Sequence, residues 1–368
     1  MKRFEYSDKE IGNKEMTMAV SSILVGAGTL TFPRLVARYT ISADGWISIM
    51  MAGVFAVFFA WIAARLASRF PNISFFDYTS KIVTKPVAYI LTFFFAIHFL
   101  LVTSYAARGI ASASKMFMLP KTPTEVIVLT FLLVVSYCVT GSRTALLRIN
   151  LFFFPMVAFV IILIQLANLR FFEAEDLLPV FATNWENLLK GAQAAYLYFA
   201  GYTIVLFYAA YMNRPKDTGR MTVYGVLIAF GLYVLIYIFA MGILSPVVAE
   251  NTMYPTLAVA KSIQLPGDFL IRFESAYFAI FMMTIFNTAS MAFDVTVICL
   301  SSIFRRVKKI VWVVILAPLI FILAMTPKTV VEMAQSRFIL VLFAFAFSLF
   351  VPACLLVIAK LRGVGAHD

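Results

Sequence analysis

The chain has 368 residues, of which 62% are hydrophobic and only 13% are charged. A soluble domain carries about 25% charged residues, so this composition excludes a water-soluble fold and predicts an integral membrane protein. The net charge of +12 does not indicate a nucleic-acid partner, because the basic residues lie in short clusters between apolar segments. Three cysteines within apolar segments and two histidines offer no metal-ligand spacing, so we expect neither a metal nor a cofactor.

Apolar segments long enough to cross a bilayer follow one another along the whole chain. A hydrocarbon core of about 30 Å needs roughly 20 apolar residues per helix, and ten segments meet this requirement. They are 14–39, 45–68, 83–115, 123–141, 147–169, 187–212, 218–244, 270–302, 310–326 and 337–360. With both termini in the cytoplasm, most of the 30 Lys and Arg residues fall in cytoplasmic segments, as the positive-inside rule requires. We therefore predict a single all-α transmembrane domain, 1–368.

The first span carries residues that interrupt a helix near its middle. Gly26 and Gly28 each cost about 1 kcal/mol of helix stability relative to Ala. Pro33 lacks an N–H, and Thr29 and Thr31 can bond to nearby backbone. Glycines alone fit a close helix contact equally well, but the proline and threonines favour a real break. A broken helix persists in hydrocarbon only where it is buried in protein or lines a wet cavity.

Two connecting segments are longer than a simple connection needs. Residues 69–82 contain Pro71 and several aromatic residues, a composition typical of an interfacial amphipathic segment. Residues 245–269 place prolines around a helical stretch, Thr256 to Ile263, which predicts a lid or re-entrant element on the outer side.

The sixth span has an interruption that corresponds to the first. Ala200, Gly201 and Tyr202 lie near its centre, five spans after the first break. Corresponding interruptions in two halves predict an inverted-repeat transporter fold. We expect a LeuT-like 5+5 architecture, the amino-acid permease fold, with repeats of about 11–170 and 186–360. In such a fold the two broken helices meet at the bilayer midplane and bind a small solute.

The third and eighth spans supply further candidates for the site. His98, Val102 and Tyr105 share one helix face, and an ionisable residue inside a span is a functional candidate. Asn287 and Thr288 lie in the middle of the eighth span. Hydrogen bonds that hold helices together explain these polar residues equally well. The full set of predicted ligand-binding residues is Gly26, Ala27, Gly28, Thr29, His98, Val102, Tyr198, Ala200, Gly201, Tyr202, Asn287 and Thr288.

A second ionisable residue, Asp294, lies nearer the cytoplasmic end of the eighth span. We expect it to form a structural pair with Arg305 or another basic residue, although a place in a proton or cation path is an alternative.

An ordered set of short motifs is similar to a known family. The motifs are Gly26-Ala27-Gly28, Leu30-Thr31-Phe32-Pro33-Arg34, Asp44-Gly45-Trp46, Tyr254-Pro255-Thr256 and Arg272-Phe273-Glu274-Ser275. Their order and spacing resemble the B subunits of spore germinant receptors, a branch of the amino acid–polyamine–organocation permease superfamily. The resemblance implies residence in the spore inner membrane and assembly with an A subunit and a lipoprotein C subunit. It also implies that the chain senses a small nutrient, often an amino acid, and triggers germination. Because the sequence places no acidic group in the pocket, we expect a neutral ligand, with a small neutral amino acid as the first candidate and a sugar as the second.

Two other function classes compete with the sensor interpretation. A secondary active transporter of amino acids would need the same pocket. Some proton-coupled relatives use a lysine in the fifth helix, whereas span 147–169 has none and offers only Asn150 and Gln165 inside the bilayer. An intramembrane enzyme is disfavoured, because the sequence shows no nucleophile–base pair, metal-ligand set or phosphate-binding loop.

Overall fold

The computed structural model describes residues 10–26, 28–261, 273–327, 332 and 340–365. In these ranges the backbone is helical apart from short connections and one isolated β-bridge between Ile11 and Met212. The helices of ten or more residues are α1 (Asn13–Val25), α2 (Gly28–Ala37), α3 (Gly45–Ser68), α5 (Lys85–Phe117), α6 (Thr124–Thr140), α7 (Arg143–Ala167), α8 (Trp185–Phe199), α10 (Thr218–Leu244), α13 (Phe273–Ile303), α14 (Lys309–Met325) and α16 (Val351–Leu361). Shorter helical segments are α4 (Phe75–Ile82), η1 (Leu169–Phe171), η2 (Ala174–Leu177), η3 (Ala200–Ile204), α9 (Val205–Tyr208), η4 (Ala209–Tyr211), η5 (Pro215–Asp217), α11 (Pro246–Asn251), α12 (Pro255–Lys261) and the π-helical η7 (Ala346–Phe350).

The described helices confirm a multi-pass membrane protein but not the count of ten spans. When adjoining helical elements are joined, seven stretches are long and apolar enough to cross a bilayer, and the bent pair α1 and α2 makes an eighth. The seven are Gly45–Ser68, Lys85–Phe117, Arg143–Ala167, Trp185–Tyr211, Pro215–Leu244, Phe278–Ile303 and Leu340–Leu361. The predicted fourth and ninth spans correspond to α6 and α14, which have only 17 residues each. At 1.5 Å per residue such a helix is about 26 Å long, which is less than the hydrocarbon core of about 30 Å.

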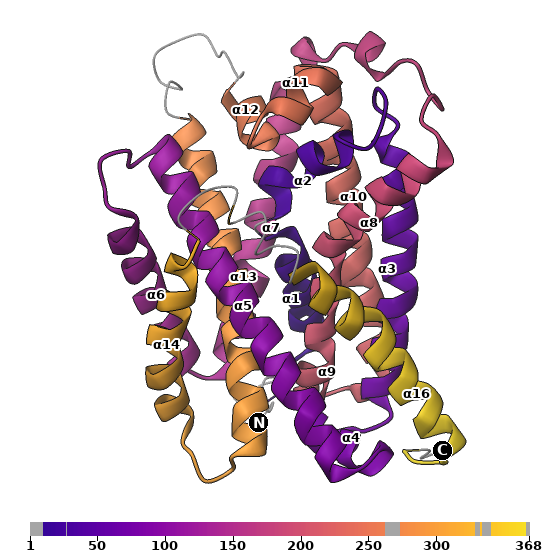
Figure 1. Ribbon diagram of the computed structural model, residues 1–368, viewed down its shortest axis with the longest axis vertical. Helices are drawn as coiled ribbons and strands as arrows, with labels where there is room; N and C mark the ends of the chain where they lie inside the picture. Colours follow the sequence, from indigo (N-terminus) through magenta and orange to yellow (C-terminus); the bar gives the residue numbers. More distant parts are fainter. Residues whose placement is uncertain (1–9, 27, 262–272, 328–331, 333–339, 366–368) are drawn as a thin grey trace, which may run out of the picture.

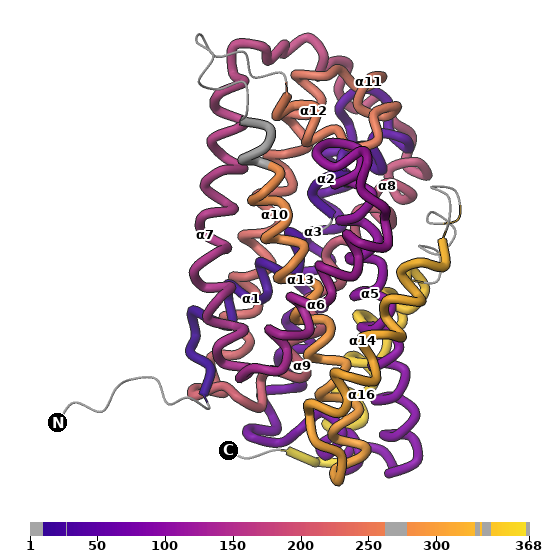
Figure 2. Tube along the Cα trace, turned by 90° about the vertical axis from the view of Figure 1, so that its left-hand side faces the viewer, coloured from indigo at the N-terminus to yellow at the C-terminus, as the bar shows by residue number. Residues whose placement is uncertain are grey.

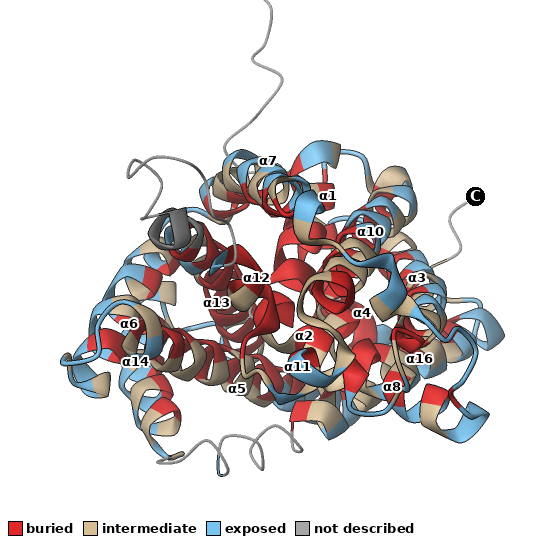
Figure 3. Ribbon diagram, turned by 90° about the horizontal axis from the view of Figure 1, so that it is seen from above, coloured by how far each residue is buried: buried red, intermediate tan, exposed pale blue. Residues whose placement is uncertain are grey.

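The long helices surround a buried centre. Figure 1 shows α2, α11 and α12 at one end of the molecule and α4 and α9 at the other. Viewed from above, buried residues cluster along α1 and α13 in the middle, whereas α6 and α14 turn exposed residues outward (Figure 3). The tube in Figure 2 follows α7 along the height of the molecule on one side, with α14 and α16 toward the other. This arrangement leaves α1 and α13 shielded from lipid by their neighbours.

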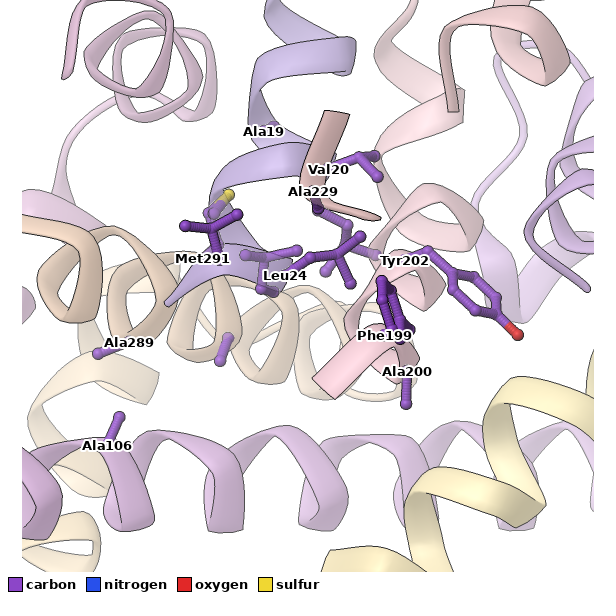
Figure 4. Packing of buried hydrophobic residues seen from close by; sticks show 14 of the residues in the cluster. Ala19, Val20, Leu24, Ala106, Phe199, Ala200, Tyr202, Ala229, Ala289 and Met291 are labelled. Atoms are coloured by element: carbon purple, nitrogen blue, oxygen red, sulfur yellow. The ribbon is translucent and has the colours of Figure 1, made fainter. Parts of the chain in front are cut away.

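Small side chains allow the central helices to approach closely. Helix α13 packs along α5, and α10 packs against both α1 and α3. Figure 4 shows Ala106 of α5 and Ala289 of α13 turned toward each other, both buried. Small residues are typical of such contacts in a membrane, because lipid tails are as apolar as a large side chain and close packing supplies the attraction.

The two long connections form helices rather than plain loops. Residues 75–82 form α4, whose N-cap residue Ser74 accepts a hydrogen bond from the Asp77 backbone N–H at 3.3 Å. The predicted helical stretch from Thr256 to Ile263 is observed as α12 up to Lys261, and its last part lies outside the described residues.

Candidate functional site

The predicted break in the first span is confirmed. Helix α1 ends at Val25, α2 begins at Gly28, and the two axes differ in direction by 53°. An added Cβ on Gly26 would lie only 1.9 Å from Thr288 Oγ1, and one on Gly28 would lie 2.2 Å from the Tyr198 ring. Glycine is therefore required here by the close approach of α13 and α8.

Side-chain hydroxyl groups satisfy backbone carbonyl groups around the break. The Tyr233 hydroxyl donates to the Leu24 carbonyl oxygen at 2.5 Å, and Thr29 Oγ1 donates to the Gly26 carbonyl oxygen at 3.0 Å. Thr256 Oγ1, from α12, donates to the Thr29 carbonyl oxygen at 2.6 Å. A buried carbonyl without a partner costs free energy, so these bonds stabilise the interrupted backbone and tie α12 to it.

The interruption of the sixth span takes a milder form than the first. Between α8 and α9 the chain adopts the 3₁₀ conformation from Ala200 to Ile204, without a gap in the helix. Thr203 Oγ1 donates to the Ala200 carbonyl oxygen at 3.2 Å. This segment has one glycine and no proline, and the other side chains are packed, so the backbone tightens instead of unwinding.

A cavity of about 280 Å³ lies beside both interruptions. Its walls come from α1, α2, α5, α8, η3, α13, the segment before α12 and residues 340–344. Seven of the predicted residues line it: Gly28, His98, Val102, Tyr198, Ala200, Gly201 and Thr288. Residues predicted from the third, sixth and eighth spans thus line the same cavity.

Four of the other predicted residues do not line the cavity. Gly26, Thr29, Tyr202 and Asn287 lie outside its lining, and Ala27 lies outside the described residues. Figure 4 shows the Tyr202 ring directed away from Ala200. Its hydroxyl contacts the Tyr196 hydroxyl and donates to the Ser348 carbonyl oxygen, both at 2.8 Å. Tyr202 therefore connects η3 to η7 through a hydrogen bond, whereas Tyr198 lines the cavity.

Two residues of the cavity lining each carry a buried polar atom that has no hydrogen-bond partner among the described residues. The atoms are His98 Nδ1 and Thr288 Oγ1, and both side chains are buried. The rings of Phe99, Phe343 and Phe347 surround the imidazole, with centroids 5.1 to 6.2 Å away. A buried polar atom without a partner carries a desolvation cost that a bound molecule with a matching group would remove.

The cavity lining also contains residues to which the sequence analysis gave no role. Arg34 on α2 and Arg38, in the turn directly after α2, supply the lining with positive charge, and no acidic residue lines it in the described part of the chain. Arg34 Nε donates to the Glu250 carbonyl oxygen at 3.1 Å. Burial raises the pKa of the Tyr254 hydroxyl, although the charge of Arg34 opposes this shift. The signal was present, because Arg34 and Tyr254 both belong to recognisable sequence motifs.

Asp294 forms the expected pair, with partners other than Arg305. Its side chain is fully buried, Arg143 Nε lies 3.5 Å from Oδ2, and Lys309 Nζ lies 3.3 Å from Oδ1. The Tyr208 hydroxyl also donates to Oδ2 at 3.2 Å. Arg305 pairs with Asp77 of α4 instead. Asp294 thereby joins α13 to α7, α14 and α9.

These features define a class of protein: a helical multi-pass membrane protein of the LeuT-like fold, with its first span broken beside an internal cavity. Solved structures that share this fold include the following two. The crystal structure of MhsT in complex with L-phenylalanine matches with a TM-score of 0.67 and 13% identity, covering 94% of this chain and 97% of that one. Mhp1, a nucleobase-cation-symport-1 family transporter, matches with a TM-score of 0.64 and 12% identity, covering 93% of this chain and 77% of its own.

The amino-acid sequence places the chain within a particular family. The model of the spore germination protein family matches residues 10–333. The chain is 34% identical to spore germination protein GerLB of Bacillus cereus, over 89% of this chain and 88% of that protein. It is 29% identical to YndE and 28% identical to spore germination protein A2, both of Bacillus subtilis, over 87% and 73% of this chain and 88% and 74% of those proteins, respectively. The chain belongs to the spore germination protein family, which confirms its resemblance to the B subunits of germinant receptors.

Proposed function

We propose that the chain is the nutrient-sensing subunit of a spore germinant receptor and binds a small ligand in the cavity beside the broken first span. The observation that carries this proposal is the cavity itself, whose lining residues His98 and Thr288 each carry a buried polar atom without a hydrogen-bond partner among the described residues. A cavity lined by apolar side chains and a few polar residues is suited to a molecule that presents both polar and apolar atoms.

The size and lining of the cavity favour a small ligand. A volume of about 280 Å³ is close to the lower end of small-molecule sites, which span roughly 300–1,000 Å³. Most lining residues are apolar, and none of those described is acidic. A small neutral amino acid fits these properties best, and a sugar is the second candidate.

Helix lengths support an arrangement of ten spans in two inverted repeats, about 11–170 and 186–360. The third and eighth spans, α5 and α13, are the longest described helices, with 33 and 31 residues, and they pack against each other. The fourth and ninth spans, α6 and α14, have 17 residues each and also pack together. Equal lengths at equivalent positions are what an internal repeat produces. Both termini would then be cytoplasmic.

Binding would act by shifting the population between two arrangements of the helices. A ligand can do this only if its affinity differs between the two arrangements. The cavity wall combines α2, α5 and α13, so a ligand that contacts all three would favour the arrangement in which they approach one another. We propose that this change is passed to the A subunit and the lipoprotein C subunit in the spore inner membrane.

The first test is direct binding. The purified chain should bind at least one member of a panel of radiolabelled amino acids and sugars, and spores lacking it should lose the response to that nutrient. Thr288→Val keeps the shape of the side chain but removes Oγ1, and should weaken binding. Thr296→Val is the matched control on the same helix, because Thr296 Oγ1 already donates to the Ala292 carbonyl oxygen and lies outside the cavity.

The second test separates a sensor from a secondary transporter with the same cavity. The purified chain is placed in liposomes, and uptake of the bound nutrient is followed with and without an ion gradient. Gradient-driven uptake at transporter rates would favour the transporter. Binding without uptake, together with loss of nutrient-triggered germination in the deletion strain, would support the sensor. Absence of binding to every nutrient in the panel would refute both.

A further inference from the structure

A second hollow lies far from the broken helices, where α4, the start of α5 and the connection from α13 to α14 meet. We call it the basic pocket. Its lining residues are Phe76, Asp77, Ser80, Lys85, Tyr89, Ser302, Ile303, Phe304, Arg305, Arg306 and Val307. Its volume is about 620 Å³, and none of the predicted ligand-binding residues belongs to it.

The charges in the basic pocket do not cancel. Asp77 forms an ion pair with Arg305 and also accepts a hydrogen bond from the Ser74 hydroxyl at 2.7 Å. Lys85 and Arg306 have no ion pair with any described residue, so the lining carries an excess of positive charge. An anion in the pocket would meet both of these side chains without displacing the pair already formed.

The surroundings of the pocket are apolar and exposed. Tyr89, which belongs to the lining, is 44% exposed and stands in the first turns of α5. The same helix continues with exposed Ile90, Phe93 and Phe94. Phe304, another lining residue, is 50% exposed. Aromatic residues beside basic ones are typical of the membrane–water interface, and the apolar surface of α5 leads from the pocket into the lipid region.

We propose that the basic pocket binds the phosphate headgroup of an anionic phospholipid, with Lys85 and Arg306 as its charge partners and the exposed face of α5 as the track of an acyl chain. Basic pockets between transmembrane helices hold such headgroups in other membrane proteins. A free phosphate compound would use the two charges but would gain nothing from the apolar surface. The pocket therefore fits a lipid better than a soluble anion.

The test uses the full chain, purified in a neutral detergent and titrated with phosphatidylglycerol or phosphatidylcholine while bound lipid is counted by native mass spectrometry. Each basic residue near an anionic headgroup contributes about 1 kcal/mol, so Lys85→Gln together with Arg306→Gln should weaken binding of phosphatidylglycerol about 30-fold. The matched control is Arg214→Gln with Lys216→Gln, which removes the same charge from exposed residues outside the pocket. It should bind phosphatidylglycerol as the wild type does.

Three results would overturn the proposal. The control pair could lose as much affinity as the pocket pair, which would indicate general surface charge. Soluble glycerol phosphate could displace the lipid at equal concentration, which would indicate a site for free phosphate. In the wild-type chain, a photoreactive phosphatidylglycerol could label segments other than residues 85–94 and 304–307. This labelling does not require a variant to fold, so it decides the question even if the double substitution is unstable.

Discussion

The fit of Gly26 against Thr288 leads to the sharpest prediction. An alanine Cβ at position 26 would lie 1.9 Å from Thr288 Oγ1 and 2.9 Å from Thr288 Cβ. Both positions are buried at the junction of α1 and α13, so neither the added methyl group nor the Thr288 side chain can move into solvent. Overpacking of this kind costs about 1–3 kcal/mol. Gly26→Ala should therefore lower the thermal stability of the purified chain and reduce the nutrient response of spores.

A double-mutant cycle tests the cause. Thr288→Ala removes the atom in closest conflict, so Gly26→Ala should be less destabilising in that background, with a coupling of about 1 kcal/mol or more. Gly231→Ala is the matched control, since its added Cβ would meet nothing within 4 Å in α10. It should be neutral, or stabilising by up to about 1 kcal/mol. Equal stability of Gly26→Ala and Gly231→Ala, or no coupling with position 288, would refute the reasoning.

Three further substitutions test other contacts by thermal unfolding in detergent. Asp294→Asn leaves two basic partners without a counter-charge and should destabilise by about 3 kcal/mol; an unchanged midpoint would show that the ion cluster is not stabilising. Thr256→Val leaves the Thr29 carbonyl without its partner and should cost about 1–3 kcal/mol, whereas wild-type stability would mean that α12 is not tied to the break. Tyr202→Phe removes the hydrogen bond to Ser348 and should lower the free energy of unfolding by about 1 kcal/mol, while nutrient preference stays the same. A changed nutrient preference would indicate that Tyr202 belongs to the ligand site after all.

Local backbone chemistry made the first break predictable from sequence. Gly26 and Gly28 weaken the helix, and the structure bends there by 53°. Helix periodicity was also sufficient to group His98 and Val102 of α5. The two residues share one face of the helix, and both line the cavity. Both inferences depend only on residues within a few positions of one another.

The roles of Tyr198 and Tyr202 could not be separated in the same way. Both flank the interruption of the sixth span, and an α-helical spacing of four residues would place them on one face. The 3₁₀ segment has three residues per turn instead of the 3.6 of an α-helix. This difference rotates the Tyr202 side chain away from the cavity and toward Ser348. Such a change of phase follows from tertiary packing and has no signature in the sequence.

Contacts between distant segments were also beyond prediction. Asp294 required a basic partner, but the choice of Arg143 and Lys309 over Arg305 depends on where α7 and α14 begin. The length of the apolar segments gave ten spans, although two of the corresponding helices are short for a bilayer. Hydropathy reports which residues avoid water, and it does not fix where a helix ends.

The length of α5 has a mechanical consequence. With 33 residues the helix is about 50 Å long, and it carries His98 near its middle and Lys85 at its start. The two residues are separated by roughly 20 Å of stiff rod, so a rocking of about 5° around the middle would displace Lys85 by roughly 2 Å. A solute that tilts this helix against its neighbours would thus also move the charged group at its start, far from the cavity.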